Sequence, residues 1–139
     1  LHALKQEVIN EGLAALERGA DGNFYVLLGA QGTFCTPMQY GGHYLEVDRE
    51  ILQTWSEARL NVLFVAGNDD VYIDFVSDLP AHLFAWDVEA STFDAAYVRT
   101  LRSGAQLSSD PESEVRLVTG LEPGQNLAAL LEKEPVHAI

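Results

Sequence analysis

Apolar positions in the first part of the chain recur at helical spacing and then form a short run. Between His2 and Arg18 they return every three or four residues, which predicts an amphipathic helix, and Gly19 follows where helices commonly end. Asn23–Leu28 is rich in β-forming residues and apolar on both faces, which predicts a strand. The stretch Gly29–Tyr44 contains 5 glycine and proline residues, so we expect a long loop.

The middle of the chain repeats this alternation. Glu46–Arg59 has a helical stripe of apolar residues, and Asn61–Ala66 is a continuous apolar run typical of a strand buried on both faces. A helix is predicted over Asp70–Leu79, ended by a proline, and a further strand over His82–Trp86. Strands alternating with helices indicate βα units and a parallel sheet.

The last third of the chain is less regular. We expect a helix that ends near Arg102, a short strand over 105–107, an element of ambiguous type over 115–119 and a final helix over 125–132. The predicted organisation is one α/β domain over residues 1–134, followed by a short tail over 135–139.

Composition narrows the possible partners. The 139 residues are 47% hydrophobic and 21% charged, as expected of a globular domain. With 21 acidic against 8 basic residues, the net charge is −13, which argues against nucleic acid or an anionic membrane as a partner. No apolar run is long enough to span a bilayer, and the single Cys35 has no internal disulfide partner, so we expect a cytoplasmic protein.

Candidate chemistry lies in the loops that follow the predicted strands, because ligands gather at the carboxyl ends of parallel strands. The predicted substrate-binding residues are Tyr25, Asn68, Asp69, Trp86 and Asp87. The acidic members suit a hard cation or acid–base catalysis, or else cap helices and stabilise turns. The two aromatic residues line a pocket or fill the core. No catalytic residue is assigned, and no metal site or cofactor is expected.

Motif order and spacing carry a family resemblance. Gly19-Ala20-Asp21-Gly22 leads into the first predicted strand. Leu60–Asn68 contains the second strand and the turn after it, and Phe84–Asp87 lies at the end of the third. This order resembles the uroporphyrinogen decarboxylase-like superfamily, which also includes corrinoid-dependent methyltransferases. The similarity extends from about Gly19 to Asp87, with a fainter echo at Thr119-Gly120.

The resemblance implies a (β/α)₈ barrel whose members decarboxylate the acetate side chains of a tetrapyrrole without a cofactor, or transfer methyl groups with zinc. The zinc ligands of that strand would fall at Phe64 and Ala66, which cannot bind metal. The family's C-terminal histidine is replaced by Thr119, and the serine on the decarboxylase's strand after the Gly-Ala-Asp segment falls near Leu28. Its essential aspartate and arginine belong to an N-terminal half that this chain lacks.

Chain length adds an expectation about partners. A full barrel needs ~250 residues, so this chain corresponds to a partial TIM-barrel-like unit, and its start at Leu1 favours a fragment. An open half-barrel exposes apolar surface, which favours a homo-oligomer or pairing with a missing N-terminal half. Two hypotheses follow: a divergent decarboxylase or methyltransferase-related protein that binds a tetrapyrrole or small methyl donor, or a catalytically degenerate binding or oligomerisation module.

Overall fold

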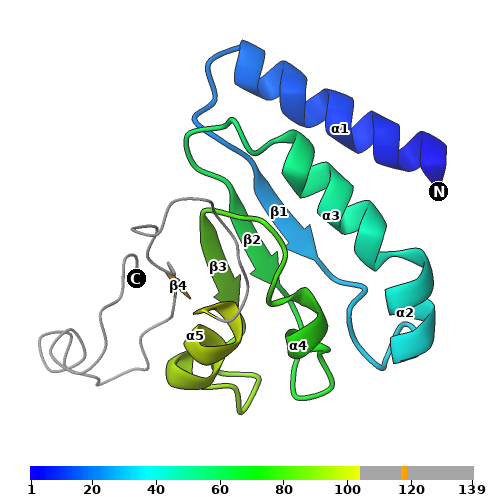
Figure 1. Cartoon of the computed structure of the whole chain (residues 1–139), viewed down its shortest axis with the longest axis vertical. Coiled ribbons are helices and arrows are strands. Elements are labelled where there is room, and N and C mark those ends of the chain that lie inside the picture. The colour runs from blue at the N-terminus through cyan, green and yellow to red at the C-terminus, as the bar shows by residue number, and fades with distance from the viewer. Residues whose placement is uncertain (104–116, 119–139) are drawn as a thin grey trace, which may run out of the picture.

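The structure is a computed structural model that describes residues 1–103 and 117–118. A long helix is followed by alternating strands and helices (Figure 1). In chain order the elements are α1 (His2–Glu17), β1 (Phe24–Leu27), α2 (Pro37–His43), α3 (Leu45–Thr54), β2 (Val62–Val65), α4 (Ile73–Val76), β3 (Leu83–Trp86), α5 (Ala95–Ser103) and β4 (Leu117–Val118).

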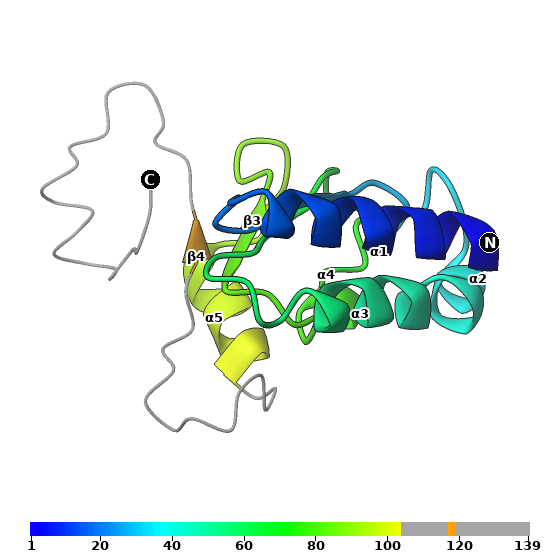
Figure 2. The ribbon, with the colours of Figure 1, turned by 90° about the horizontal axis from the view of Figure 1, so that it is seen from above.

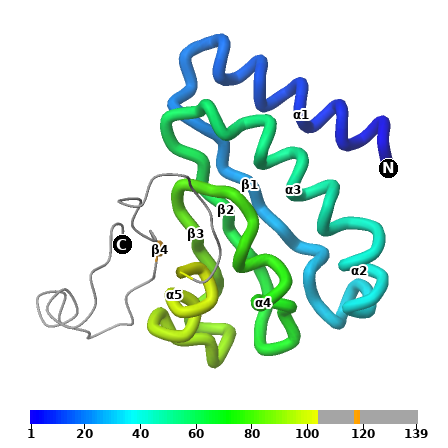
Figure 3. The backbone as a smooth tube through the Cα atoms, viewed as in Figure 1, coloured from blue at the N-terminus to red at the C-terminus, as the bar shows by residue number. Residues whose placement is uncertain are grey.

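The strands form a 4-stranded sheet in the order β1-β2-β3-β4, and every pair is parallel. Each strand therefore lies beside the next one in the chain, as the tube in Figure 3 makes easy to follow. This confirms the predicted α/β fold with parallel βα units. The sheet formed by the described residues is open, so the barrel stays a prediction.

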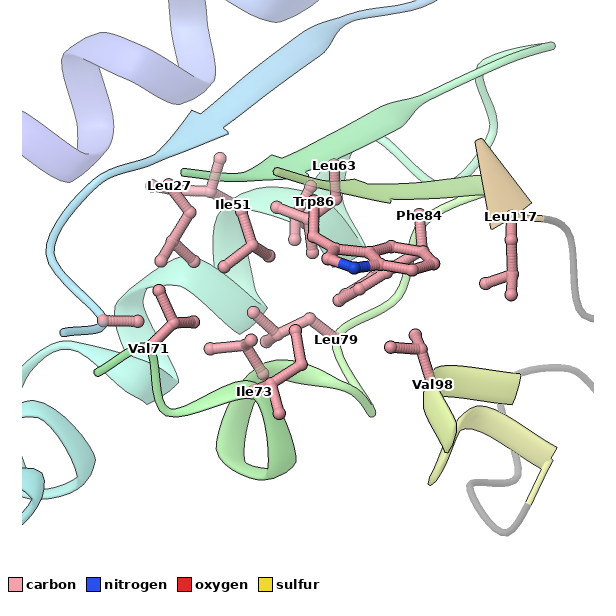
Figure 4. Close-up of a cluster of buried hydrophobic side chains, with 14 of the residues drawn as sticks. Leu27, Ile51, Leu63, Val71, Ile73, Leu79, Phe84, Trp86, Val98 and Leu117 are labelled. Carbon is pink, nitrogen blue, oxygen red and sulfur yellow. The ribbon is translucent and has the colours of Figure 1, made fainter. Parts of the chain in front are cut away.

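The core lies between one face of the sheet and the connecting helices. Seen from above, α3 and α5 lie on the same side of the strands (Figure 2). Strand register aligns Leu63, Phe84 and Leu117 in one row across the sheet and Leu27, Val65 and Trp86 in the next. All six side chains are buried, and Figure 4 shows those it labels meeting Ile51, Ile73 and Val98 from the helices and Leu79 from the segment after α4.

The opposite face of the sheet is also apolar, but much of it is open. On β1 and just after it, Phe24 is 65% exposed, and Val26 and Leu28 are exposed as well. The Phe24 ring stacks on that of Phe64, with centroids 6.3 Å apart, and Phe64 is only partly buried. We call this surface, with Val62, Phe64, Leu83, Ala85 and Val118 of the other strands, the open face. Because both faces are apolar, the strand sequences show no clear period-two alternation.

Helix α1 packs on α3, with Trp55 at the end of α3 as a main contact. The Nε1 atom of Trp55 donates a hydrogen bond to the carbonyl of Ile9 at 3.2 Å, and Gly12 lies against the indole. A Cβ atom on Gly12 would lie 2.3 Å from the ring, so only glycine permits this approach. The helix ends before Gly19, whose φ of 100° confirms the predicted helix-ending role.

The predicted helix Glu46–Arg59 ends early, at Thr54, and two further predicted elements are wrong. The predicted loop Gly29–Tyr44 contains the helix α2, because Thr36 and Gln39 form a capping box and Pro37 occupies the first turn. These start signals outweigh the two glycines inside the helix. The predicted helix Asp70–Leu79 is only α4, because residues before it form a turn in which the Asp70 N–H donates to Asn68 Oδ1.

Near the end of the chain, the structure describes one of the predicted segments. The ambiguous segment 115–119 contains β4. The predicted strand over 105–107 and helix over 125–132 lie outside the described residues. Within the part of the chain that is described, no helix combines the length and apolar character needed to cross a bilayer.

Candidate functional site

The loops that follow β1, β2 and β3 meet at one edge of the sheet, which we call the carboxyl edge. Gln31 lies in the first loop and is buried. Its Nε2 donates to the carbonyl of Leu28 at 2.7 Å and to that of Ala66 at 3.2 Å, so one side chain bridges the ends of β1 and β2. The Tyr72 N–H also donates to the Ala30 carbonyl at 2.8 Å. The first two loops are therefore joined through side-chain and backbone hydrogen bonds.

Carboxylates extend these links. Oδ2 of Asp70 accepts from both the backbone N–H and the hydroxyl of Thr33, each at 3.0 Å, while its Oδ1 is buried without a hydrogen-bond partner. Oδ1 of Asp69 accepts from the N–H of Thr92 in the third loop, at 2.6 Å. All three loops are thus connected to their neighbours along the carboxyl edge.

Of the three predicted polar site residues, Asn68 and Asp87 stabilise turns, and Asp69 joins two loops. Asn68 Oδ1 accepts from the Asp70 N–H at 3.1 Å, and Asp87 Oδ1 accepts from the Ala90 N–H at 3.1 Å. With the bond from Asp69 to Thr92, each of these side chains contacts a backbone donor. Among the described residues, no three or more His, Cys, Asp or Glu side chains gather where they could hold a metal ion. Ligand binding by Asn68, Asp69 and Asp87 stays a prediction.

The two predicted aromatic residues have different surroundings. Trp86 is 5% exposed, and its Nε1 donates to the carbonyl of Phe93 at 2.9 Å, so it fills the core (Figure 4). Tyr25 is only partly buried and lines a pocket of about 280 Å³. Tyr25 is thus the member of the predicted set around which a site can be built.

This tyrosine pocket lies where β1 meets α2 and α3. Aromatic side chains of Tyr25, Phe34, Tyr40 and Tyr44 line it, together with the carboxylate of Asp48. The hydroxyl of Tyr25 donates to Oδ1 of Asp48 at 2.7 Å, and the hydroxyl of Tyr40 donates to Oδ2 at 2.8 Å. Each carboxylate oxygen therefore accepts one tyrosine hydrogen bond and keeps a further lone pair.

Burial dominates the electrostatics of this cluster. It raises the pKa of Asp48 above its ordinary value, although the hydrogen bonds from Tyr25 and Tyr40 act in the opposite direction. Burial, followed by the charge of Asp48, raises the pKa of both tyrosines, which keeps their hydroxyls protonated as donors. Among the described residues, no ion pair includes Asp48. Two tyrosine hydroxyls therefore stabilise this carboxylate by hydrogen bonds, but no described side chain neutralises its charge.

Sequence reasoning missed Asp48 and Tyr40. An aspartate in the first turn of a helix ordinarily complements the helix dipole at the surface, so nothing local marked Asp48 as partly buried. Tyr40 was assigned to a loop because α2 was not recognised, although the Thr36-Pro37 start signal was present.

Comparison of the chain with protein-family models, with curated proteins and with solved structures found no match. Any function must therefore be argued from this chain's own residues and from the resemblance in its motifs.

Proposed function

We propose that the chain is a divergent uroporphyrinogen decarboxylase-like protein, whose reaction removes carboxyl groups from the acetate side chains of a tetrapyrrole. The observation that supports this most is the sheet order β1-β2-β3-β4 with every pair parallel. Consecutive strands of a (β/α)₈ barrel lie side by side in this way. A doubly wound sheet would instead reverse its strand order at a switch point.

The methyltransferase branch of the superfamily is less compatible with these residues. Its zinc ligands would occupy Phe64, on the open face of β2, and Ala66, just beyond the strand. Neither side chain carries a donor atom for zinc, so no methyl transfer through zinc can be assigned to this position. The cofactor-free decarboxylase chemistry is therefore the branch we propose.

The open face offers a large apolar surface for a ligand. Phe24, Val26 and Leu28 present an exposed apolar row on the side that would face the interior of a barrel, and the stacked pair of Phe24 and Phe64 adds aromatic surface. An exposed apolar surface of this kind marks a binding or interaction site. The apolar pyrrole rings of a tetrapyrrole would pack on this surface.

The direct experiment is incubation of the chain with uroporphyrinogen under anaerobic conditions, with the oxidised products separated by chromatography. The proposal predicts products with fewer carboxyl groups, ending in coproporphyrinogen. Phe24→Ser is expected to reduce the yield, because it removes an exposed ring from the open face. Phe75→Ser on α4 is the matched control, since Phe75 is also exposed but lies on another surface. Unchanged uroporphyrinogen, with a chain shown to be folded, would refute the decarboxylase proposal.

A second candidate is a non-enzymatic binding or oligomerisation module. It is favoured by the charge: the chain carries −13, and the open face has no basic side chain on β1, β2 or β3 to hold the carboxylates of a tetrapyrrole. In this case the open face packs against a second copy of the chain. Sedimentation at micromolar concentration should then show a dimer that Phe24→Ser weakens, whereas a monomer for the unmodified chain would contradict this candidate.

A further inference from the structure

The tyrosine pocket is separate from the proposed decarboxylation, although Val26 and Leu28 of the open face are also among its lining residues. It lies on the helix-covered side of the sheet, where Tyr25 points to α3 through its hydrogen bond with Asp48. At about 280 Å³ it is at the lower end of the ~300–1,000 Å³ typical of small-molecule sites. It therefore suits a compact ligand rather than a macrocycle.

The lining indicates the charge of that ligand. Four aromatic residues and one carboxylate line the pocket, and no lysine, arginine or histidine is among its lining residues. An anion would meet Asp48 with no compensating charge. A hard metal ion prefers six or more oxygen ligands, while this pocket offers a single carboxylate beside tyrosine hydroxyls.

An organic cation meets neither objection. The faces of aromatic rings attract ammonium groups, and an aromatic cage is the usual means by which proteins recognise quaternary ammonium ions. Asp48 supplies the compensating charge, and its two tyrosine hydrogen bonds hold the carboxylate in place. We propose that the tyrosine pocket binds a small alkylammonium group, with the cation between the aromatic rings and against Asp48.

The affinity of the tyrosine pocket for an alkylammonium ion should depend on pH. Burial raises the pKa of Asp48, and a bound cation would lower it again by favouring the charged form. The other titratable groups lining the pocket are Tyr25 from β1, Tyr40 from α2, Tyr44 and Cys35. Tyr25 and Tyr40 have raised pKa values and stay protonated. Affinity for an alkylammonium ion should therefore increase as the pH rises through the pKa of Asp48.

The test compares choline with 3,3-dimethylbutan-1-ol, a neutral molecule of the same shape, by titration calorimetry and by the fluorescence of the chain. Trp55 is a suitable reporter because its ring lies 5.9 Å from that of Tyr25, between centroids. We expect saturable binding of choline and at least about tenfold weaker binding of the alcohol. Equal binding of the two molecules, or no saturable binding of choline, would overturn the proposal.

Variants provide a second measurement. Asp48→Asn should weaken choline binding about tenfold or more, whereas Asp74→Asn on α4 removes the same charge from an exposed position and should not. Tyr44→Leu keeps an apolar rim but removes a ring, and should weaken binding about two- to fivefold. Its control is Tyr97→Leu, because Tyr44 is 44% exposed and Tyr97 is 46% exposed but lies on α5. Equal effects of Tyr44→Leu and Tyr97→Leu would contradict the aromatic cage, even if Asp48→Asn failed to fold.

Discussion

Asn61, just before β2, offers the sharpest test of what holds this fold together. It is 1% exposed, and its side chain joins two segments distant from each other in the chain. Oδ1 accepts from the N–H of Asn23 at 3.0 Å, and Nδ2 donates to the carbonyl of Trp55 at 2.6 Å. The side chain therefore connects the residue before β1 with the end of α3.

We predict that Asn61→Leu lowers the free energy of unfolding by about 2–4 kcal/mol. The Asn23 N–H would lose its acceptor inside the protein, at a cost of about 1–3 kcal/mol. The lost bond to the Trp55 carbonyl adds about 1 kcal/mol. It adds no more than this, because that carbonyl also accepts from the Ala58 N–H at 2.9 Å and keeps a partner.

Urea denaturation followed by tryptophan fluorescence measures this change, since Trp55 and Trp86 are both buried. The matched control is Asn10→Leu on the exposed side of α1, where we expect a change within about 0.5 kcal/mol. A loss below about 0.5 kcal/mol for Asn61→Leu, or equal losses for the two variants, would refute the assigned role of Asn61.

Asn61→Asp separates the two hydrogen bonds. The variant keeps an acceptor for the Asn23 N–H but places a carboxyl group against the Trp55 carbonyl. Burial should raise the pKa of the introduced carboxyl above its unfolded value of about 3.9. A raised folded-state pKa gives stability that is present at low pH and lost as the pH rises. Relative to the unmodified chain, this variant should therefore become less stable as the pH rises above about 4.

Three further predictions concern other parts of the fold. Gly22→Ala should destabilise the chain by about 1–3 kcal/mol or more, because the new Cβ would lie 1.7 Å from the Leu60 carbonyl oxygen. The control is Gly29→Ala, whose Cβ meets nothing within 4 Å and should change stability little. Thermal unfolding compares the two variants. Because the pKa of Asp48 is raised in the folded protein, its contribution to stability is present below the ordinary aspartate pKa and is lost as the pH rises through its folded-state pKa. Asp48→Asn should remove this decline in stability with pH. Urea denaturation at several pH values measures the difference. Leu63→Ala should cost about 2–5 kcal/mol in the same assay, because Leu63 is fully buried in the central row of the sheet.

The strands and their parallel arrangement could be predicted because their signals are local. Asn61–Ala66 is a continuous apolar run between helical segments, and such runs are typical of buried parallel strands. Because the run is apolar throughout, the sequence does not indicate which face of the strand the helices cover. Phe64 and Val65 are both apolar, yet Val65 is buried under the helices while Phe64 is only partly buried on the open face.

The tyrosine pocket could be predicted only in part, because its contacts are long-range. Tyr25 was recognised as a candidate from its place on a strand. Asp48 lies 23 positions further along the chain, and its burial depends on how α3 packs beside β1. A single sequence has no local pattern that reports such an arrangement.

The hydrogen bonds of Gln31 have a practical consequence for protein engineering. Because this one side chain contacts the ends of both β1 and β2, the loops at the carboxyl edge are not independent modules. Exchanging the first loop alone would remove the amide that the second strand end uses. A designer who wishes to alter specificity at this edge should therefore transplant the loops after β1 and β2 as one unit. Gln31 should be retained, because its side chain hydrogen-bonds to both strand ends.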